Sequence, residues 1–495
     1  MFSVVRLALS NDSSVQPVGW LAESHDSHGI ASRRDLPEVA APVVVTDKRG
    51  KRKWTVFVPP GTDSALNATQ LLGICDKCHQ LAGQIPAPDR DFIDVREAVE
   101  AGYLPVFADK RGQAKGQQQG SGPATSRKTE RTQDPVCERS LTFVLESGDA
   151  GLGNTLLMLW MAYGLADKEG RAFFIDDSRW AYGEYTDIFR PPPSPGCSAP
   201  PRQEMIPCPR HARHLVASPT TAWELFLGLE EGLASSAESQ ESTLQRAEFD
   251  LARHGYDGLF QLNSEDADYV DNRVRELIAK RVPPKTKGSQ SGVAIGNHIR
   301  RGDRHPLEFM YRDSYIPISK YSDTARNIID ERVGKDTAAK HHSFLIIASD
   351  DPTVYENDDF ADAPPAQDRI KLASKQATQS DAPDRRVMHK FVDENFGWEG
   401  GFFASMFWNL GIASTSAAAP TNTAPRAETV RLRSLVGRAY LMDLAVLADA
   451  SDAVVCTASA AGCRLLAVMM GWESAMERGN WVNIDRGSTW TGLLR

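Results

Sequence analysis

Two adjacent arginines stand where a predicted strand ends, in the stretch His298–Arg304, which reads His-Ile-Arg-Arg-Gly-Asp-Arg. An arginine side chain presents a planar fork of N–H donors that fits phosphate oxygens. Gly302 permits the backbone to turn, so that Arg300 and Arg301 can face one ligand. The stretch therefore indicates a phosphate site, although by itself a solvated basic loop paired with Asp303 fits the same residues.

Two adjacent carboxylates follow another apolar segment of the same half. Asp350 and Asp351 come after residues 343–349 and directly before Pro352. They could bind Mg²⁺, hydrogen-bond to sugar or base groups, or cap the helix that Pro352 begins. The spacing alone favours the capping role.

A third feature is the small-residue stretch 457–462, which includes Ser459 and lies between a predicted strand and a predicted helix. Small side chains let backbone N–H groups approach a ligand, and a helix N-terminus favours anions. Upstream, Asp443 interrupts an apolar helix. A buried carboxylate needs hydrogen-bond partners, and the N–H donors of a guanine edge would supply them.

The elements that must position these residues are two α/β halves. In the first, a strand over 141–146, a turn with Gly148, Gly151 and Gly153, a helix over 154–168 and a strand over 172–176 predict the start of a doubly wound domain. In the second, strands over 292–298, 343–349 and 453–456 alternate with helices over 318–332, 430–448 and 463–470. Ligands of such sheets sit beyond the carboxyl ends of the strands.

The predicted fold class is therefore α/β, with two Rossmann-like domains facing a cleft and an irregular N-terminal extension. The predicted boundaries are 1–135 for the extension, 136–285 for the first domain and 290–495 for the second. The extension is expected to hold a lone strand over 53–58, a helix over 65–83 and a polar linker over 109–134. Residues 281–291 would link the domains, and 358–385 would form a surface loop.

Composition narrows the class of protein. The 495 residues include 41% hydrophobic and 24% charged side chains, which is ordinary globular composition. A net charge of −9 argues against nucleic acid as the main partner. No run of about 18 apolar residues predicts a transmembrane helix, and the first ten residues lack a signal-peptide core.

The seven cysteines are an odd count. Cys75 and Cys78 form a CxxC pair that invites a redox or zinc interpretation. No second CxxC and no paired histidines follow, so the zinc interpretation is disfavoured.

A dinucleotide-dependent oxidoreductase is a competing interpretation of the first half. The glycine turn at 148–153, followed by Asp176 and Asp177, superficially suggests an NAD(P)- or flavin-binding fold. The pattern is GxxGxG, however, and not the GxGxxG that such folds use.

Taken in order, these motifs resemble those of the α-1,6-fucosyltransferase family of the N-glycan core, a GT-B-type group that uses GDP-fucose. The stretch 298–304 is similar to that family's His-Val-Arg-Arg-Thr-Asp-Lys, and 345–352 is similar to its Tyr-Leu-Ala-Thr-Asp-Asp-Pro. The region from Leu441 through Cys456 to Arg464 resembles its last nucleotide-binding motif. Residues 148–165 and 178–191 also resemble the first half of that family. The likeness covers residues 137–470 in patches.

The resemblance implies an inverting transfer of fucose from GDP-fucose, the donor substrate, to a glycan or glycoprotein hydroxyl, with no cofactor and no metal. It also implies a Cys456–Cys463 disulfide and a place in the Golgi or secretory pathway. For the donor, the resemblance implies that Arg300 and Arg301 hold the diphosphate, that His298 and Asp443 recognise guanine, and that Ser459 belongs to the donor site. It implies that Glu308 is the catalytic base, with Asp303 and Arg304 in support. It also implies that the sugar site is lined by Asp350, Asp351 and Tyr321.

Several positions depart from the family pattern. Arg304 replaces a lysine and stays charged, so it cannot relay a proton. Ala460 replaces a serine that helps hold the donor phosphates. The longer spacing after Glu308 makes Tyr321 a loose match, and the family's coiled coil and SH3 domain have no counterpart. A non-catalytic nucleotide- or glycan-binding relative is therefore the main alternative.

Overall fold

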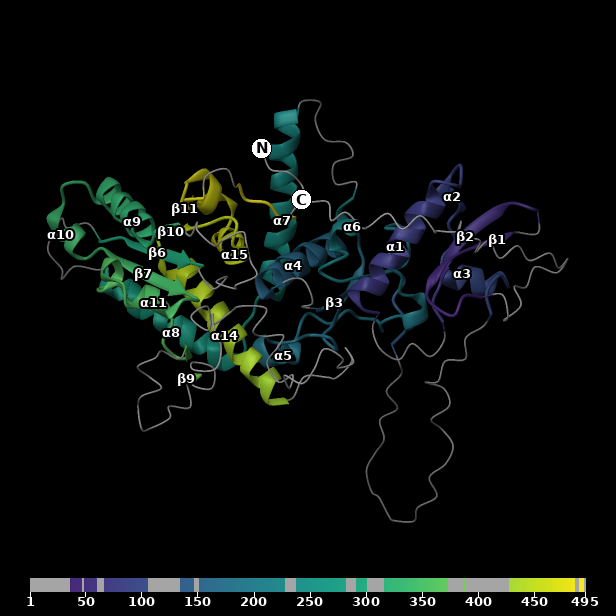
Figure 1. The fold of residues 1–495 in the computed structure, drawn as a ribbon, viewed down its shortest axis with the longest axis horizontal. Coiled ribbons are helices and arrows are strands. Elements are labelled where there is room, and N and C mark those ends of the chain that lie inside the picture. The colour runs from purple at the N-terminus through teal and green to yellow at the C-terminus, as the bar shows by residue number, and fades with distance from the viewer. Residues whose placement is uncertain are drawn as a thin grey trace, which may run out of the picture. The chain divides into compact units, whose positions relative to one another are not determined.

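The computed structural model describes residues 36–46, 49–59, 66–105, 134–146, 151–227, 237–281, 291–300, 316–372, 387–388, 427–485 and 489–493. The chain forms two compact units. The first combines Met1–Asp63, Leu72–Arg131 and Pro201–Arg213, and the second combines Ser64–Leu71, Thr132–Pro200 and His214–Arg495. Figure 1 labels the elements of both units.

The first unit holds an antiparallel hairpin and short helices. Strand β1 (Ala41–Thr46) pairs with β2 (Arg52–Phe57), so the strand expected to stand alone has a partner. Helices α1 (Ala68–Ala82), α2 (Pro88–Asp91) and α3 (Val95–Glu100) follow. The 3₁₀ turn η2 (Arg202–Glu204) packs against α3, within the segment that joins this unit from later in the chain. Trp54 is almost fully buried, and its indole N–H donates to the Pro88 carbonyl at 2.7 Å.

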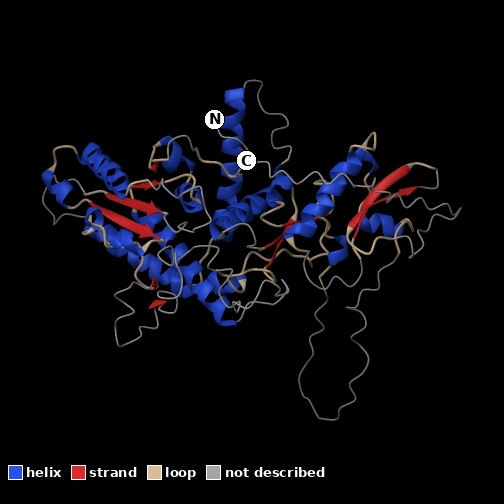
Figure 2. Ribbon diagram, in the orientation of Figure 1, coloured by secondary structure: helices blue, strands red, loops and turns tan. Residues whose placement is uncertain are grey.

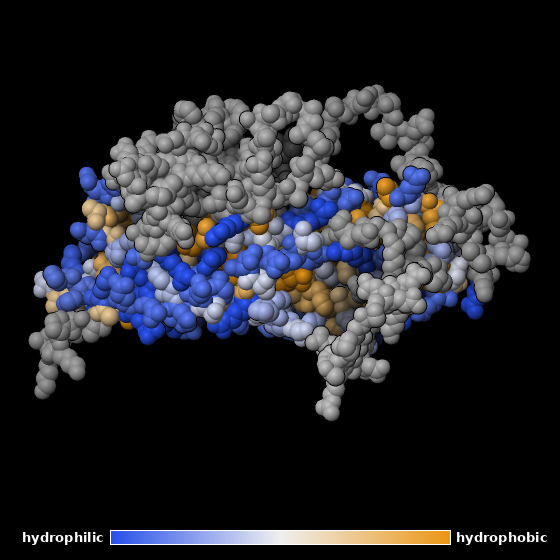
Figure 3. Space-filling model, turned by 90° about the horizontal axis from the view of Figure 1, so that it is seen from below, coloured by the Kyte–Doolittle hydropathy of each residue, from blue (hydrophilic) through white to orange (hydrophobic). Residues whose placement is uncertain are grey.

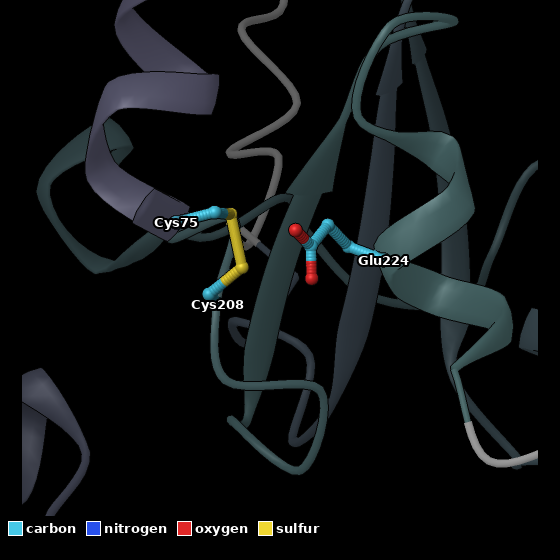
Figure 4. Close-up of side chains that lie close together, drawn as sticks. All are labelled: Cys75, Cys208 and Glu224. Carbon is cyan, nitrogen blue, oxygen red and sulfur yellow. A yellow bond between two sulfur atoms is a disulfide. The ribbon is translucent and has the colours of Figure 1, made fainter. Parts of the chain in front are cut away.

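Two disulfides account for the cysteines before residue 210, apart from Cys78. In the first unit Cys75 of α1 is bonded to Cys208, with their Cα atoms 5.5 Å apart (Figure 4). Cys78 is buried and forms no disulfide. In the second unit Cys137 is bonded to Cys197. The zinc interpretation of the CxxC pair is wrong, because the sulfur of Cys75 already belongs to a disulfide.

The second unit contains two parallel sheets, of three and four strands, and a short parallel pair formed by β8 (Lys371–Leu372) and β9 (Val387–Met388); strands are drawn as red arrows in Figure 2. The first has the order β4-β3-β5, built from β3 (Ser140–Val144), β4 (Ala172–Asp176) and β5 (His214–Ala217). Helix α4 (Leu152–Lys168) lies between β3 and β4 in the chain, which confirms the predicted order of strand, helix and strand, whereas Gly148 of the predicted glycine turn lies outside the described residues. Helices α5 (Tyr185–Ile188) and α6 (Ala222–Phe226) are short.

Glycines let α4 pack closely against α7 (Ala237–Leu259). A Cβ on Gly164 would lie 2.3 Å from the Leu251 carbonyl oxygen, and one on Gly255 would lie 2.0 Å from that of Trp160. No side chain could occupy either position without moving a backbone. The nearly all-buried α4 is thereby covered by a helix that the sequence analysis left unassigned.

The second sheet has the order β11-β10-β6-β7, and every pair is parallel. Its strands are β6 (Ala294–Ile299), β7 (Phe344–Ser349), β10 (Ala453–Cys456) and β11 (Trp481–Asn483). The sequence predicted three of them, and the three-residue β11 is the one that it missed. Together the two sheets give a mixed α/β fold built on parallel strands.

Helices cover the second sheet on both faces. One side carries α9 (Ile318–Val333), with α10 (Thr337–His341) and the turn η4 (Asp358–Phe360) beside it, and the core there includes Ile295, Ile299 and Leu345. The other side carries α14 (Ala427–Ala450), which packs against β6 and β7 and along α8 (Ser264–Lys280). The remaining elements are α11 (Pro352–Tyr355), β8 (Lys371–Leu372), β9 (Val387–Met388), α15 (Ala461–Met470) and the π-helical η7 (Glu473–Glu477).

Polar residues predominate on the one face of the described residues that Figure 3 shows, with apolar residues in small areas. Among the residues that the structure describes, no helix combines the length and the apolar character that crossing a membrane requires.

Candidate functional site

The carboxyl ends of β6, β7 and β10 meet at one edge of the second sheet. Register pairs His298 with Ala348 and Ile299 with Ser349. Because side chains alternate along a strand, Ile295 and Ile299 face the core under α9, whereas Gly296 and His298 face α14. A Cβ on Gly296 would lie 3.0 Å from Leu447 of α14, so this helix passes close above β6.

Arg300 is held at this edge by a carboxylate of the neighbouring strand end. Its guanidinium donates to Asp350, whose side chain is 5% exposed. The Ser349 hydroxyl donates to the Ile299 carbonyl at 2.8 Å and accepts from the Asp351 N–H at 3.1 Å. Both strand ends are therefore tied together, and the direction of the Arg300 fork is fixed before any ligand arrives.

His298 is buried and uncharged. Burial, followed by the charge of Arg300, lowers its pKa from 6.5 to about 4. Its Nδ1 is buried and finds no hydrogen-bond partner among the described residues. A neutral imidazole with an unsatisfied ring nitrogen can exchange one hydrogen bond with a ligand that reaches it.

Tyr440 of α14 lies where two helix N-termini meet. A Cβ on Gly153 of α4 would lie 2.9 Å from its hydroxyl, and one on Gly462 of α15 would lie 2.8 Å from it. The same Cβ on Gly462 would lie 2.6 Å from the His298 ring. A Cβ on Gly153 would also lie 2.8 Å from the Cβ of Ala461. Gly153 and Gly462 are thus needed to leave space for Tyr440 and His298.

Asp443 lies one turn further along α14 and is 6% exposed. Burial raises its pKa well above the ordinary value of 3.8 and so favours the protonated carboxyl group. Its Oδ1 accepts the Gln367 N–H at 3.3 Å. Asp443 and His298 face the same side of the sheet, as two groups that read one base would have to do.

The loop between β10 and α15 is closed by the disulfide Cys456–Cys463, which confirms the pairing that the resemblance implied. The Ala458 N–H donates to the Asn483 side chain at 2.9 Å, which fixes the loop to β11. Ser459 is exposed. The N-cap residue of α15, Ala460, supplies no side-chain acceptor, so this helix start depends on other partners.

Two residues of this site have no role in the sequence analysis. Tyr182 follows β4, and burial raises its pKa to about 12 against the opposing charges of Arg433 and Arg300. Arg433 of α14 is 3% exposed, and burial lowers its pKa. Tyr440 is a third residue without a predicted role. Of the three, Tyr182 had a usable signal, because it lies inside the stretch 178–191 that resembles the family.

Other predicted site residues divide into two groups. Tyr321 is 2% exposed and belongs to the same apolar core under α9 as Ile299 and Val354. Arg301, Asp303, Arg304 and Glu308 lie outside the described residues, as does Gly148.

The carboxylates that suggested a dinucleotide site have partners within their own loop. Asp176 accepts from the N–H and the hydroxyl of Ser178, at 3.1 and 2.5 Å. Asp177 accepts the Tyr185 N–H at 2.7 Å. These bonds shape the turn that brings Tyr182 toward Arg300.

No protein-family model and no curated protein sequence matches the chain. Solved structures that it resembles include the NodZ α-1,6-fucosyltransferase co-crystallised with GDP, at 15% identity and a TM-score of 0.31 over 68% of this chain and 91% of that one. They also include the fucosyltransferase NodZ from Bradyrhizobium, at 14% identity and a TM-score of 0.33 over 68% of this chain and 92% of that one. These values describe a partial superposition.

Proposed function

We propose that the chain is an inverting, GT-B-type glycosyltransferase that moves fucose from GDP-fucose to a glycan hydroxyl. The observation that carries the proposal is the Arg300 guanidinium, oriented by buried Asp350 at the carboxyl edge of a parallel sheet. A guanidinium has five N–H donors, so it can keep a carboxylate on one side and still bind phosphate oxygens. The adjacent Arg301 doubles the positive charge available to a diphosphate.

Recognition of the base would fall to the two buried groups on the α14 side. The unsatisfied Nδ1 of His298 and the carboxyl of Asp443 both suit a guanine edge, which offers paired donors and an acceptor. The N-terminus of α15 beside Gly462 and the exposed Ser459 would face the phosphates. Asp351 and Tyr321 are retained as weaker candidates for the sugar site, because both are almost fully buried.

The reaction would be a direct displacement. The acceptor hydroxyl loses its proton to the Glu308 carboxylate as its oxygen bonds to the anomeric carbon, and the bond from that carbon to the phosphate oxygen breaks. GDP departs with the electron pair, and Arg300 and Arg301 stabilise the charge that develops on it. Asp303 and Arg304 would support the base.

The cysteines support a proposal about the compartment. Three disulfides form in the structure, and disulfides persist in oxidising compartments. They support the proposal that the chain folds in the secretory pathway, with the Golgi as the expected site of action.

The test is a GDP-release assay over a panel of nucleotide sugars, each with a mixture of glycan acceptors. GDP-fucose should be the donor from which GDP is released in an acceptor-dependent way. Binding of GDP without release from any donor would instead identify a non-catalytic nucleotide-binding protein. Thermal stabilisation by NAD(P) but not by GDP would overturn the proposal in favour of an oxidoreductase.

A further inference from the structure

Residues 364–370, here called the strap, lie along the outer edge of β7, with Ala366, Gln367 and Ile370 buried. The Ile347 N–H donates to the Pro364 carbonyl at 3.1 Å, and the Ala366 N–H donates to the Ile347 carbonyl at 2.8 Å. Pro365 lies between them and lacks an N–H, as suits an outer position in a sheet. The strap thus extends the sheet that carries the candidate site.

Helix α8 anchors the strap from the other side. Arg273 donates to the Pro365 and Ala366 carbonyls, at 2.7 and 3.1 Å. The Tyr269 hydroxyl donates to the Asp368 carboxylate at 2.5 Å and accepts the Asp368 N–H at 2.8 Å. These bonds fix the backbone of the strap on both sides of its middle residue, Gln367.

A third anchor connects the strap to α14 through the start of α8. Arg369 donates to the Glu265 carbonyl and carboxylate, each at 2.8 Å, and lies 3.5 Å from Asp266. Asp266 is fully buried and also accepts two hydrogen bonds from Arg438 of α14, at 2.6 and 2.9 Å. The strap, α8 and α14 therefore share one network of charged groups.

Gln367 is locked inside the strap. Its side-chain oxygen accepts the Ile370 N–H at 2.9 Å, and its side-chain nitrogen donates to the Ile370 carbonyl at 2.7 Å. With both ends of the side chain occupied, the backbone N–H of Gln367 has a fixed direction, and it donates to Asp443. Fully buried apolar residues, Met442 and Leu444, flank Asp443 on α14.

We infer that the strap is a positioning element for base selection, in which the anchors on α8 hold the Gln367 N–H against one oxygen of Asp443 and so aim the other oxygen at the base. The inference rests on the proposed function, because it assumes that Asp443 reads the nucleobase. A carboxylate held in one direction can accept hydrogen bonds from both the N1–H and the 2-amino group of guanine. Hypoxanthine has only the N1–H, so it loses one of these bonds. A loosened strap lets Asp443 rotate and reduces that distinction.

The test removes one hydroxyl. In Tyr269→Phe the affinity for GDP should fall about two- to tenfold, the effect of one or two hydrogen bonds. The affinity for inosine diphosphate should change less, so the ratio of the two affinities should decrease. Titration calorimetry with each nucleotide measures both. Tyr163→Phe, the same chemical change on α4, should leave the ratio unaltered.

A second pair of variants cuts the same anchor from the other side. Asp368→Ala should reproduce the reduced ratio, and Asp368→Asn should restore it, because an amide oxygen still accepts the Tyr269 hydroxyl. A merely structural role would lower thermal stability without changing the ratio. An unchanged ratio in Tyr269→Phe and Asp368→Ala, in a protein that prefers GDP to inosine diphosphate, overturns the strap and leaves the proposed function standing. A wild-type chain that binds no GDP overturns both.

Discussion

Arg300 and Asp350 meet across the ends of two neighbouring strands, with the guanidinium of one donating to the buried carboxylate of the other. A buried carboxylate stays ionised at low energetic cost only beside a partner of opposite charge. Each residue therefore needs the other. The pair links the two strand ends and holds the Arg300 guanidinium at the carboxyl edge of the sheet.

Arg300→Ala should lower the affinity for GDP about ten- to a hundredfold, because a charge-assisted contact to the diphosphate is lost. Titration calorimetry measures the change. Arg300→Lys is the control, since it keeps a positive charge beside Asp350 but lacks the paired N–H donors of a guanidinium. Its affinity for GDP should lie between those of the wild type and Arg300→Ala. Unchanged GDP affinity in Arg300→Ala would remove the diphosphate assignment.

Glu308→Gln should separate binding from chemistry. Gln has nearly the same shape but cannot accept the acceptor's proton, so transfer should fall about a hundredfold or more. GDP affinity should stay within about twofold of the wild type. Single-turnover transfer from the donor measures the first quantity and calorimetry the second. Retained transfer would point to another base.

Asp443→Asn should make the unliganded protein more stable than the wild type, and the difference in stability should grow as the pH rises. Burial raises the pKa of Asp443 in the folded chain, so its contribution to stability is present below the ordinary pKa of 3.8 and is lost as the pH rises toward the folded value. Asn does not titrate. The melting temperature of the variant should therefore exceed that of the wild type at pH 8, and the gap should close near pH 4.

The same variant should bind GDP more weakly, because guanine needs the ionised carboxylate. Wild-type affinity should rise with pH as the proton on Asp443 is released on binding, and the variant should show no such slope. A variant that is less stable than the wild type at pH 8 would contradict the buried, protonated state of Asp443.

Gly153→Ala should destabilise the fold by about 1–3 kcal/mol, the usual cost of overpacking. The added methyl would lie 2.8 Å from Ala461 and 2.9 Å from the Tyr440 hydroxyl. Gly151→Ala is the matched control two residues earlier, where a Cβ meets nothing within 4 Å. Chemical denaturation compares the two. Equal losses would show that the crowding around Tyr440 is unimportant.

Strands with strong patterns were predicted closely. Residues 172–176 and 453–456 match β4 and β10, and the helix expected from Ile318 matches α9 to within a residue at its end. These segments are apolar and bounded by glycine or polar residues. Strands β5 and β11 were missed because each is short and includes a polar residue, His214 or Asn483, where the equally short β10 is an unbroken apolar run.

The strap shows a second reason why structure could not be predicted from local sequence. Residues 358–385 were predicted to be a surface loop because they are polar, yet Ala366 and Gln367 are buried. Their polar groups are satisfied by α8, which lies about a hundred residues earlier in the chain. Nothing local in the sequence records such a partner. Tyr440 was missed for a similar reason, since its importance depends on glycines of two other helices.

Helix α15 is held at both ends by the first half of its unit. Arg464 donates to Asn154 of α4 at 2.5 Å, and Arg253 of α7 donates to the Val468 and Met469 carbonyls at 2.9 and 2.7 Å. Amide hydrogens of α15 should therefore exchange with solvent in step with those of α4 and α7, and not with those of β10, which precedes it in the chain. The sheet edge that carries Arg300 would then be complete only after two regions have folded, one that contains β10 and one that contains α4, α7 and α15.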